Sequence, residues 1–327
     1  MQPAETSYTT ATIASTPPAN LDVSQTCKAA GDPLRSSILK LLGTSSFGVL
    51  ELCELFDMAQ PAMSHHLKNL VEAGLVEKRP EGTFVFYQRN SRPTEFTQSV
   101  YRALDAETIP TELLDRMKLV YQSRARRSQA FFASNASALK QQHTLVCQDD
   151  VYTPAVVTTC ESRLPEQRGR LLEVGPGDGA LLVQLATIFE QVHAIDTSPI
   201  NLDSTQRATA ELANVKLEEA DFFTLPASNR YHAIVAAMVI HHLAAPAQFF
   251  SRAREHLLPG GLLLVVELAK HSQQWVTEAC GDVWLGFETE ELIQWADQAS
   301  FTSENLQHLA QRNGFNVQVH TFQLNSE

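Results

Sequence analysis

The feature that most constrains the fold is a regular alternation of short apolar segments with amphipathic ones in the second half of the chain. The apolar segments read LLEV, VHAID, VKLEEA, YHAIVAAMV and GLLLVVELA, and helix-like segments begin at Ala180, near 202–212 and near 247–257. Apolar strands that alternate with helices indicate a parallel sheet with both faces covered. Residues 151–327 are therefore predicted to form an α/β, Rossmann-like domain with a mostly parallel sheet. The same reading predicts an irregular connector from Asp149 to Arg168 and at most one strand at the C-terminal end.

The first half of the chain follows a different pattern. Residues 1–20 are rich in Thr, Ser, Ala and Pro and are predicted to be a disordered tail. Residues 21–92 are predicted to form a mainly helical domain: two helices broken at Gly31-Asp32-Pro33, a helix–turn–helix, and a hairpin turning at Pro80-Glu81-Gly82. This order is that of a winged helix. Residues 93–150 read as a long helical arm that breaks at Ile109-Pro110 and needs a partner subunit or the next domain to cover its apolar stripe.

Composition excludes several classes of protein. Hydrophobic residues make up 44% of the chain, which rules out disorder throughout. Five scattered cysteines with no CxxC pair argue against a disulfide scaffold or a four-cysteine zinc site. No signal-like N-terminus or long apolar stretch is present, so a cytoplasmic protein without a membrane segment is expected. The net charge is −12, and residues 151–327 hold ten basic against twenty-one acidic residues, so a polyanion would approach the N-terminal half.

The segment AQPAMSHHLKNLVEAGLVEKR is typical of a helix that reads DNA. The residues expected to face the core are Ala62, Leu67, Leu70 and Val71. Polar residues would then lie on the other side, where a major groove is accessible, and basic residues of the hairpin would reach phosphates. The residues predicted to contact DNA are Ser64, His65, Lys68, Asn69, Lys78 and Arg79. The alternative is a small packing domain with a solvated polar face.

This segment, together with AGDPLRSSILKLL and the hairpin TFVFY, resembles the ArsR family of winged-helix repressors. The resemblance implies a homodimer that binds a double-stranded DNA operator. Many members of that family sense metals through a cysteine pair on the helix before the recognition helix. Here that helix reads LELCELFD, with Glu51 at the first position and only Cys53 remaining. One thiolate between acids is a poor site for a soft metal, so no metal site is predicted.

A glycine-rich turn in LLEVGPGDGALLVQLA marks a ligand-binding loop. Gly175, Gly177 and Gly179 lie between a strand and a helix, and glycine lets the backbone turn tightly and approach a ligand. The spacing also fits a dinucleotide loop, but Asp178 would oppose a pyrophosphate. S-adenosylmethionine has no phosphate and carries a sulfonium and an ammonium, which tolerate acids. Asp196, at the end of the next strand, is placed to accept ribose hydroxyls.

The complete set of motifs resembles class I methyltransferases over roughly residues 165–325. The motifs are the EVGPGDG loop, Asp196, the pair Asp221 and Phe222, the MVIHHL segment and LLPGGLLLVVE. The resemblance implies that Glu173 and the glycines hold the methionine end of S-adenosylmethionine or S-adenosylhomocysteine. It places Asp196 at the ribose, and Asp221 with Phe222 at the adenine. Two alternatives remain from the residues alone: Glu173 as a satisfied strand-end acid and Asp221 as the cap of a turn.

Two functions follow from this reading. The first is a homodimeric transcriptional regulator whose methyltransferase-like domain binds S-adenosylmethionine or S-adenosylhomocysteine as an effector. The alternative is an active small-molecule methyltransferase that uses its winged helix for dimerisation or self-regulation. His241 and His242 are the candidate catalytic bases, with packing or helix capping as the plainer explanation. His232 stands where class I relatives usually have Asp, which disfavours turnover more than binding.

Overall fold

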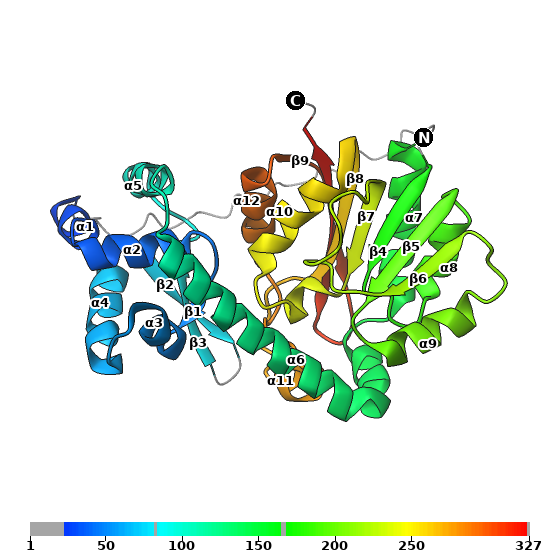
Figure 1. Cartoon of the computed structure of the whole chain (residues 1–327), viewed down its shortest axis with the longest axis horizontal. Coiled ribbons are helices and arrows are strands. Elements are labelled where there is room, and N and C mark those ends of the chain that lie inside the picture. The colour runs from blue at the N-terminus through cyan, green and yellow to red at the C-terminus, as the bar shows by residue number, and fades with distance from the viewer. Residues whose placement is uncertain (1–22, 82–83, 165–167, 326–327) are drawn as a thin grey trace, which may run out of the picture.

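The protein consists of two lobes joined by a long helix (Figure 1). The computed structural model describes residues 23–81, 84–164 and 168–325, so the predicted tail at 1–20 lies outside the described residues. The first lobe is helical with a small sheet, and the second is built around a large sheet. Both fold classes agree with the prediction.

The first lobe is a winged helix. Its elements are α1 Val23–Ala30, α2 Pro33–Leu42, β1 Phe47–Gly48, α3 Val49–Phe56, α4 Gln60–Glu72, β2 Val76–Glu81 and β3 Phe84–Arg89. The three strands form an antiparallel sheet in the order β1-β3-β2. In α4, Met63, Leu67 and Leu70 are buried, whereas Ala62 is exposed, contrary to the prediction. Pro80 and Glu81 belong to β2, and the predicted turn residue Gly82 lies outside the described residues.

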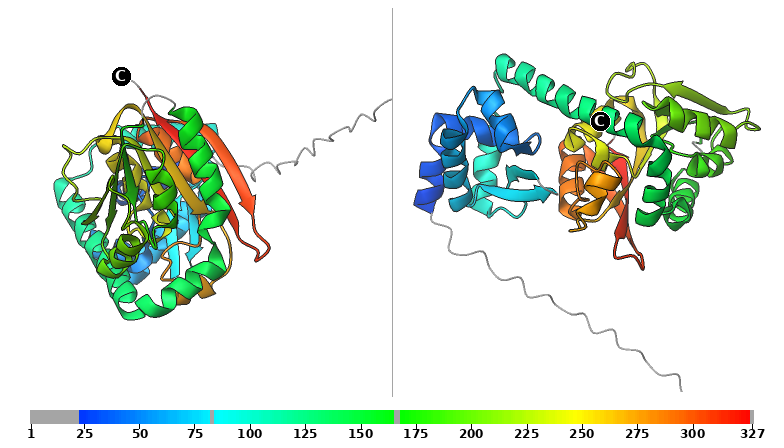
Figure 2. Two further views of the ribbon diagram at one scale, coloured as in Figure 1. Left: turned by 90° about the vertical axis from the view of Figure 1, so that its right-hand side faces the viewer. Right: turned by 90° about the horizontal axis from the view of Figure 1, so that it is seen from below.

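The helical arm consists of α5 Glu95–Asp105 and α6 Thr111–Val146, separated near the predicted break. Helix α6 runs from the winged-helix lobe to the sheet lobe (Figure 2). It packs against α3 at one end and α11 at the other. Among the described residues, no helix, α6 included, combines the length and apolar character needed to cross a bilayer.

Helix α7, Asp149–Arg163, occupies the segment predicted to be an irregular connector. Tyr152, Val156 and Cys160 are buried on one side of it, at the spacing of an amphipathic helix. Pro154 within the helix obscures this pattern in the sequence. The prediction for 149–163 was therefore wrong, and the chain enters the sheet lobe as a packed helix.

The second lobe is a seven-stranded sheet in the order β6-β5-β4-β7-β8-β10-β9. Its strands are β4 Arg170–Val174, β5 Gln191–Asp196, β6 Val215–Glu219, β7 Tyr231–Ala237, β8 Leu257–Leu268, β9 Phe301–Ala310 and β10 Asn316–Leu324. Neighbouring strands from β6 to β8 are parallel, and β10 is antiparallel to both of its neighbours. Two strands therefore follow the last helix, where at most one was expected. Strand β9 was missed because it lies at the edge of the sheet and most of its side chains are polar.

Helices cover both faces of this sheet (Figure 1). They are α8 Ala180–Ala186, α9 Pro199–Ala208, η1 Ile240–His242, α10 Pro246–His256, α11 Trp275–Ala279 and α12 Thr289–Gln298. Because successive strand residues point to opposite faces, Leu171 packs in the core beneath α7 and α8, and Leu172 packs with α10 and α12. Strands buried on both faces explain the continuous apolar runs in the sequence.

An ion cluster buries the wing against the sheet lobe. The Arg79 guanidinium on β2 pairs with Glu81 and with Glu291 of α12, and it donates to the carbonyl of Gly286 at 2.7 Å. Lys270 pairs with the same Glu81 carboxylate, which also accepts the backbone N–H of Leu285. Arg79 is 4% exposed and Glu81 is 1% exposed. Two cations and two anions balance one another in a cluster of which only Lys270 is partly exposed.

Trp284 and Arg124 complete the interface. The Trp284 ring lies against Phe86 of β3, with centroids 4.8 Å apart, and its Nε1 donates to the carbonyl of Leu243. Arg124 of α6 forms an ion pair with Glu51 in the winged helix and donates to the carbonyl of Ala244 in the sheet lobe, both at 2.6 Å. The aromatic segment around Trp284 therefore forms the core between the lobes.

Replacing Arg79 with Leu is expected to destabilise the protein by about 3–5 kcal/mol, because it leaves two buried carboxylates without their guanidinium. The matched control is Lys78→Leu, which changes an exposed neighbour on the same strand and should alter stability by less than about 0.5 kcal/mol. Urea unfolding followed by tryptophan fluorescence measures both changes. Equal effects of the two substitutions would contradict the importance assigned to the ion cluster.

Candidate functional site

The carboxyl ends of β4, β5 and β6 lie side by side and bring the predicted ligand-binding residues to one edge of the sheet. The Gly175 N–H donates to the carbonyl of Ile195 at 2.9 Å, which fixes the glycine loop beside the end of β5. The Ala220 N–H donates to the carbonyl of Asp196 at 3.1 Å, which places the Asp221 segment on the other side. The loop, Asp196 and Asp221 thus lie together along one edge of the sheet, which we call the crevice because parallel sheets commonly bind ligands in a crevice at this edge.

Gly175 and Gly177 of the loop need to be glycine for different structural reasons. A Cβ on Gly175 would lie 2.6 Å from Cγ2 of Val239. Val239 belongs to the turn after β7, and its close approach requires glycine at position 175. Gly177 has a φ of +59° and nothing within 4 Å of the position of a Cβ. A left-handed backbone beside open space is where a ligand can come close to the main chain. Thr205 holds this position by donating to the carbonyl of Gly177 at 3.0 Å.

Three carboxylates surround the methionine end of the predicted site. Glu173 is 2% exposed, and its Oε2 has no hydrogen-bond partner in the part of the chain that the structure describes. Burial, reinforced by the charge of Asp149, raises the pKa of Glu173 to about 8. Burial also raises the pKa of Asp149, and the nearby Asp178 adds to that rise. Sequence reasoning missed Asp149 because the segment that carries it was read as an irregular connector. Neighbouring carboxyl groups whose negative charge is not balanced by positive partners favour a cationic ligand.

Asp196 is held by its own turn. Its two oxygens accept the Ser198 N–H at 2.7 Å and the Asn201 amide at 3.1 Å, and burial raises the pKa of the carboxyl. Each oxygen of a carboxylate has room for a second donor. Asp196 therefore retains acceptor capacity for a ligand hydroxyl.

The two residues predicted at the adenine differ in their positions. Asp221 is exposed and accepts the backbone N–H of Phe223 at 2.9 Å, so it caps the turn, which was the alternative left open by the sequence. Phe222 is 4% exposed and packs against Phe249, with centroids 4.9 Å apart. Its ring belongs to the core beneath the crevice, which corrects the prediction that it offers a face to the ligand. The half-buried neighbour Phe223 lies closer to the surface.

The histidine pair lies on η1, immediately after β7. His241 Nδ1 lies 2.7 Å from Oε2 of Glu267, a fully buried carboxylate of β8. The other oxygen of Glu267 accepts the backbone N–H groups of Val239, Ile240 and His241. Burial alone would lower the pKa of His241, but Glu267 and Asp282 outweigh it and raise this pKa to about 9.

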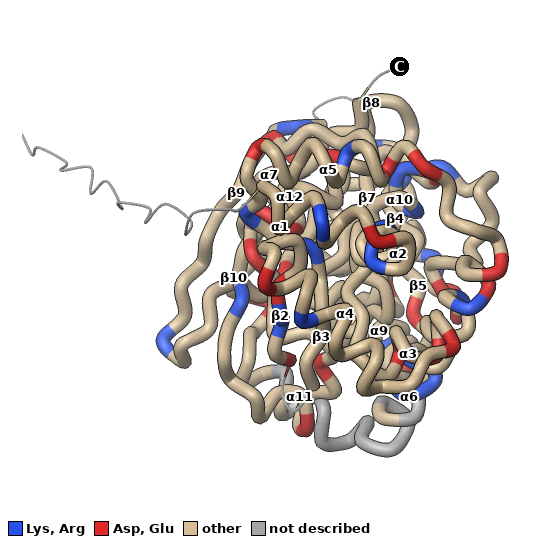
Figure 3. The backbone as a smooth tube through the Cα atoms, turned by 90° about the vertical axis from the view of Figure 1, so that its left-hand side faces the viewer, with Lys and Arg blue, Asp and Glu red and all other residues tan. Residues whose placement is uncertain are grey.

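The predicted DNA-reading face is accessible for most of its residues. Ser64, His65, Lys68 and Lys78 are exposed, and Asn69 is half-buried. Seen from the outer end of the winged-helix lobe, basic and acidic positions are interspersed (Figure 3). Arg79 is the exception: its burial in the ion cluster removes it from the predicted phosphate contacts in this conformation.

Glu51, which stands at the first position of the ArsR cysteine pair, has a structural role in this protein. Glu51 accepts two hydrogen bonds from Arg124, at 2.8 and 2.6 Å, and one from the Gly48 N–H at 2.8 Å. Cys53 is half-buried, and burial raises the pKa of its thiol. A neutral thiol beside an occupied carboxylate is not a soft-metal site.

The fold and both sites define a winged-helix DNA-binding module joined to a methyltransferase-type domain. Comparison with known proteins agrees with this class. The model of the bacterial regulatory protein family arsR matches residues 32–78, and the model of a methyltransferase domain matches residues 152–320. The chain belongs to the arsR family in its N-terminal module and to the methyltransferase domain family over more than half of its length.

Individual relatives follow the same division. The arsenical resistance operon repressor of Staphylococcus xylosus is 37% identical over 84 residues, which are 26% of this chain and 78% of the repressor. The ubiquinone biosynthesis O-methyltransferase of Cereibacter sphaeroides is 27% identical over 125 residues, which are 37% of this chain and 50% of that enzyme. The chain thus spans half the length of this methyltransferase relative.

One solved structure supports the fold of the second lobe. It is the 1,6-didemethyltoxoflavin-N1-methyltransferase of Burkholderia thailandensis, crystallised with bound 1,6-didemethyltoxoflavin and S-adenosylhomocysteine. The two proteins superpose with a TM-score of 0.52 at 15% identity, over 63% of this chain and 91% of that one. At this identity the likeness concerns the fold alone.

Proposed function

We propose that the protein is a DNA-binding transcriptional regulator whose methyltransferase domain binds S-adenosylmethionine or S-adenosylhomocysteine as an effector. The observation that carries this proposal is that the wing is buried against the segment that carries Trp284. The turn η1, which borders the crevice, holds that segment in place. A change in the crevice therefore has a direct physical route to the DNA-binding module.

The crevice favours a cationic adenosine ligand. Asp149, Glu173 and Asp178 interact electrostatically there, and an ionised carboxylate gains from a sulfonium or an ammonium nearby. A pyrophosphate would meet the same acids unfavourably. The sulfonium distinguishes S-adenosylmethionine from S-adenosylhomocysteine, so the methyl donor is the tighter ligand under this proposal.

The route from crevice to wing runs through η1. Val239 lies against Gly175, and two residues later the carbonyl of His241 accepts the N–H groups of Val283 and Trp284, each at 3.1 Å. Trp284 then contacts Phe86 of the wing. A ligand that binds differently to the DNA-bound and free conformations shifts their populations, and the coupling is reciprocal.

A homodimer would place two recognition helices on one operator. Apolar side chains exposed on the winged-helix lobe support this part of the proposal: Val23 on α1 is 52% exposed and Phe96 on α5 is 36% exposed. The two helices are in contact with each other. A second copy of the chain would cover these side chains, as the ArsR family resemblance implies.

An active methyltransferase is the second candidate function. It is favoured by the position of η1: this turn carries His241 and His242, and Val239, immediately before it, packs against Gly175 of the glycine loop. Methyl transfer from a sulfonium depends largely on the positioning of donor and acceptor, so it does not require a particular base.

The regulator hypothesis predicts that S-adenosylmethionine changes the apparent affinity for operator DNA by about fivefold or more. Gel shifts with and without the ligand measure this change. Lys68→Ala should weaken DNA binding with and without ligand alike, because it removes a phosphate contact on α4. Trp284→Phe should reduce the ligand effect, because it removes the Nε1 hydrogen bond to Leu243. Superimposable binding curves for the wild type would exclude effector control.

The ligand hypothesis predicts about tenfold tighter binding of S-adenosylmethionine than of S-adenosylhomocysteine by calorimetry, from one additional charge near three carboxylates. Because the pKa of Glu173 is raised to about 8, ionised Glu173 becomes more abundant between about pH 6 and 7.5. The affinity should therefore rise in that range, by up to about tenfold per pH unit, and Glu173→Gln should flatten this rise. Asp203→Asn, an exposed acid on α9, is the control. Equal affinities at every pH would contradict the electrostatic argument.

The enzyme hypothesis predicts transfer of a labelled methyl group to a small-molecule acceptor. Asp196→Ala should abolish transfer and donor binding together, because it removes the predicted ribose contact. Mass spectrometry of candidate acceptors measures the transfer. Strong donor binding with no transfer across phenol, amine and carboxylate acceptors would favour the regulator.

A further inference from the structure

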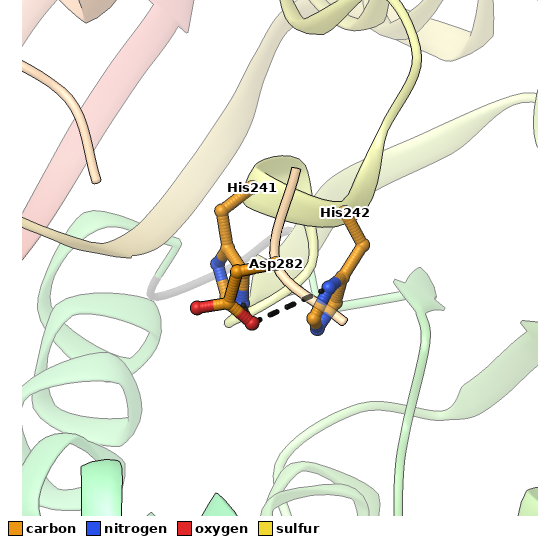
Figure 4. A group of neighbouring side chains, drawn as sticks. All are labelled: His241, His242 and Asp282. Carbon is orange, nitrogen blue, oxygen red and sulfur yellow. Dashed lines mark ion pairs between the residues drawn. The ribbon is translucent and has the colours of Figure 1, made fainter. Parts of the chain in front are cut away.

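His241, His242 and Asp282 converge at the boundary between the crevice and the lobe interface. The histidines come from η1, and Asp282 comes from the segment just after α11. Both imidazole rings lie beside the Asp282 carboxylate (Figure 4). Oδ1 of Asp282 lies 3.8 Å from Nε2 of His241 and 3.7 Å from Nδ1 of His242, and one ligand atom of each residue falls within 4.8 Å of the others. We propose that these three residues bind a divalent transition-metal ion of the zinc class.

The separations favour a shared ion over direct hydrogen bonds. A nitrogen and an oxygen 3.7–3.8 Å apart are too distant for a hydrogen bond. Around a tetrahedral ion with bonds of about 2.0–2.1 Å, neighbouring ligand atoms lie about 3.3 Å apart. The two histidine–aspartate separations therefore need to close by roughly half an ångström. The separation between the two histidine nitrogens, at most 4.8 Å, needs to close by up to about 1.5 Å, and side-chain χ rotations supply these shifts.

The burial of Asp282 is an independent reason to propose a bound cation. Its side chain is 2% exposed, and its Oδ1 has no hydrogen-bond partner among the described residues. A buried carboxylate oxygen without a donor is costly, and buried charges are paired or coordinate metals. A cation between the three side chains supplies the missing partner of this oxygen.

Glu267 prepares His241 as a ligand. The Nδ1 of His241 lies 2.7 Å from the Glu267 carboxylate, so Nδ1 keeps its proton, and a bound metal ion would displace the second ring proton from Nε2, the nitrogen nearer Asp282. A carboxylate behind the imidazole is the usual support of a metal-bound histidine, since it fixes the tautomer and increases the basicity of the ring. Glu267 is itself held by three backbone N–H groups.

The donor set selects the class of ion. Two imidazoles and one carboxylate suit zinc, cobalt or ferrous iron, whereas magnesium and calcium prefer oxygen ligands and copper(I) prefers sulfur. Three protein ligands leave a coordination position for water or another small molecule. The His242 side chain is 14% exposed, so the ion has a path from solvent. Metal binding at this site does not depend on the nucleoside ligand proposed above.

Cobalt(II) titration of the full-length, chelator-treated protein tests the proposal. We expect visible d–d absorption that saturates at one ion per chain and is displaced by Zn²⁺, with metal content confirmed by mass spectrometry. His242→Ala and Asp282→Asn should each weaken Zn²⁺ binding about tenfold or more. His308→Ala, an exposed histidine on β9, and Cys53→Ser, at the ArsR metal position, are the controls and should bind like the wild type.

Three results would overturn the proposal: no saturable binding, binding unchanged by His242→Ala, or binding lost in Cys53→Ser. Thermal unfolding gives a second readout, since Zn²⁺ should raise the melting temperature of the wild type but not that of His242→Ala. If Asp282→Asn does not fold, His242→Ala decides, because its ring is partly exposed and its loss leaves the Glu267 contacts in place. None of these measurements contains S-adenosylmethionine, so their failure leaves the proposed function untouched.

Discussion

The relative position of the two lobes depends on the burial of one guanidinium between two carboxylates. Arg79 leaves water only because Glu81 and Glu291 compensate its charge, and Lys270 pairs with Glu81 to balance the cluster. Such a cluster tolerates little displacement, because a separated buried charge is far more costly than a paired one. Arg124 adds a second connection from α6 to both lobes. The wing is thereby a structural part of the methyltransferase lobe as well as of the DNA-binding module.

The turn at η1 serves several parts of the structure at once. Glu267 fixes its backbone amides, Val239 closes against Gly175, and the His241 carbonyl holds the segment that carries Trp284. The buried Glu267 carboxylate thus determines the position of the crevice wall, the orientation of the His241 ring and the position of the Trp284 segment at the interface. A regulator that must transmit occupancy of a crevice to a DNA-binding wing benefits from such a short route, since coupling needs a contiguous element with two arrangements.

Both domains and most of the crevice could be predicted from sequence because each depends on local patterns. The Gly175 loop, Asp196 and Asp221 lie at ends of adjacent parallel strands, and a regular strand–helix alternation brings such ends together. Helix α7 was missed because Pro154 masks the helical spacing of its apolar residues. Strand β9 was missed because the polar side chains of an edge strand mask the alternation of a strand. Phe222 was misassigned because its sequence position does not reveal on which side of the strand end its ring packs.

The sequence by itself determined the two domain types, the glycine loop and the exposed face of α4, because hydrophobic period and turn chemistry are written in neighbouring residues. Only the tertiary structure decided the role of Arg79, which reads as a DNA contact on its own strand and becomes an interface residue through Glu291, more than two hundred positions away. It also decided that Asp282 meets His241 and His242. Contacts between distant segments depend on how the lobes pack, and no local pattern records that packing.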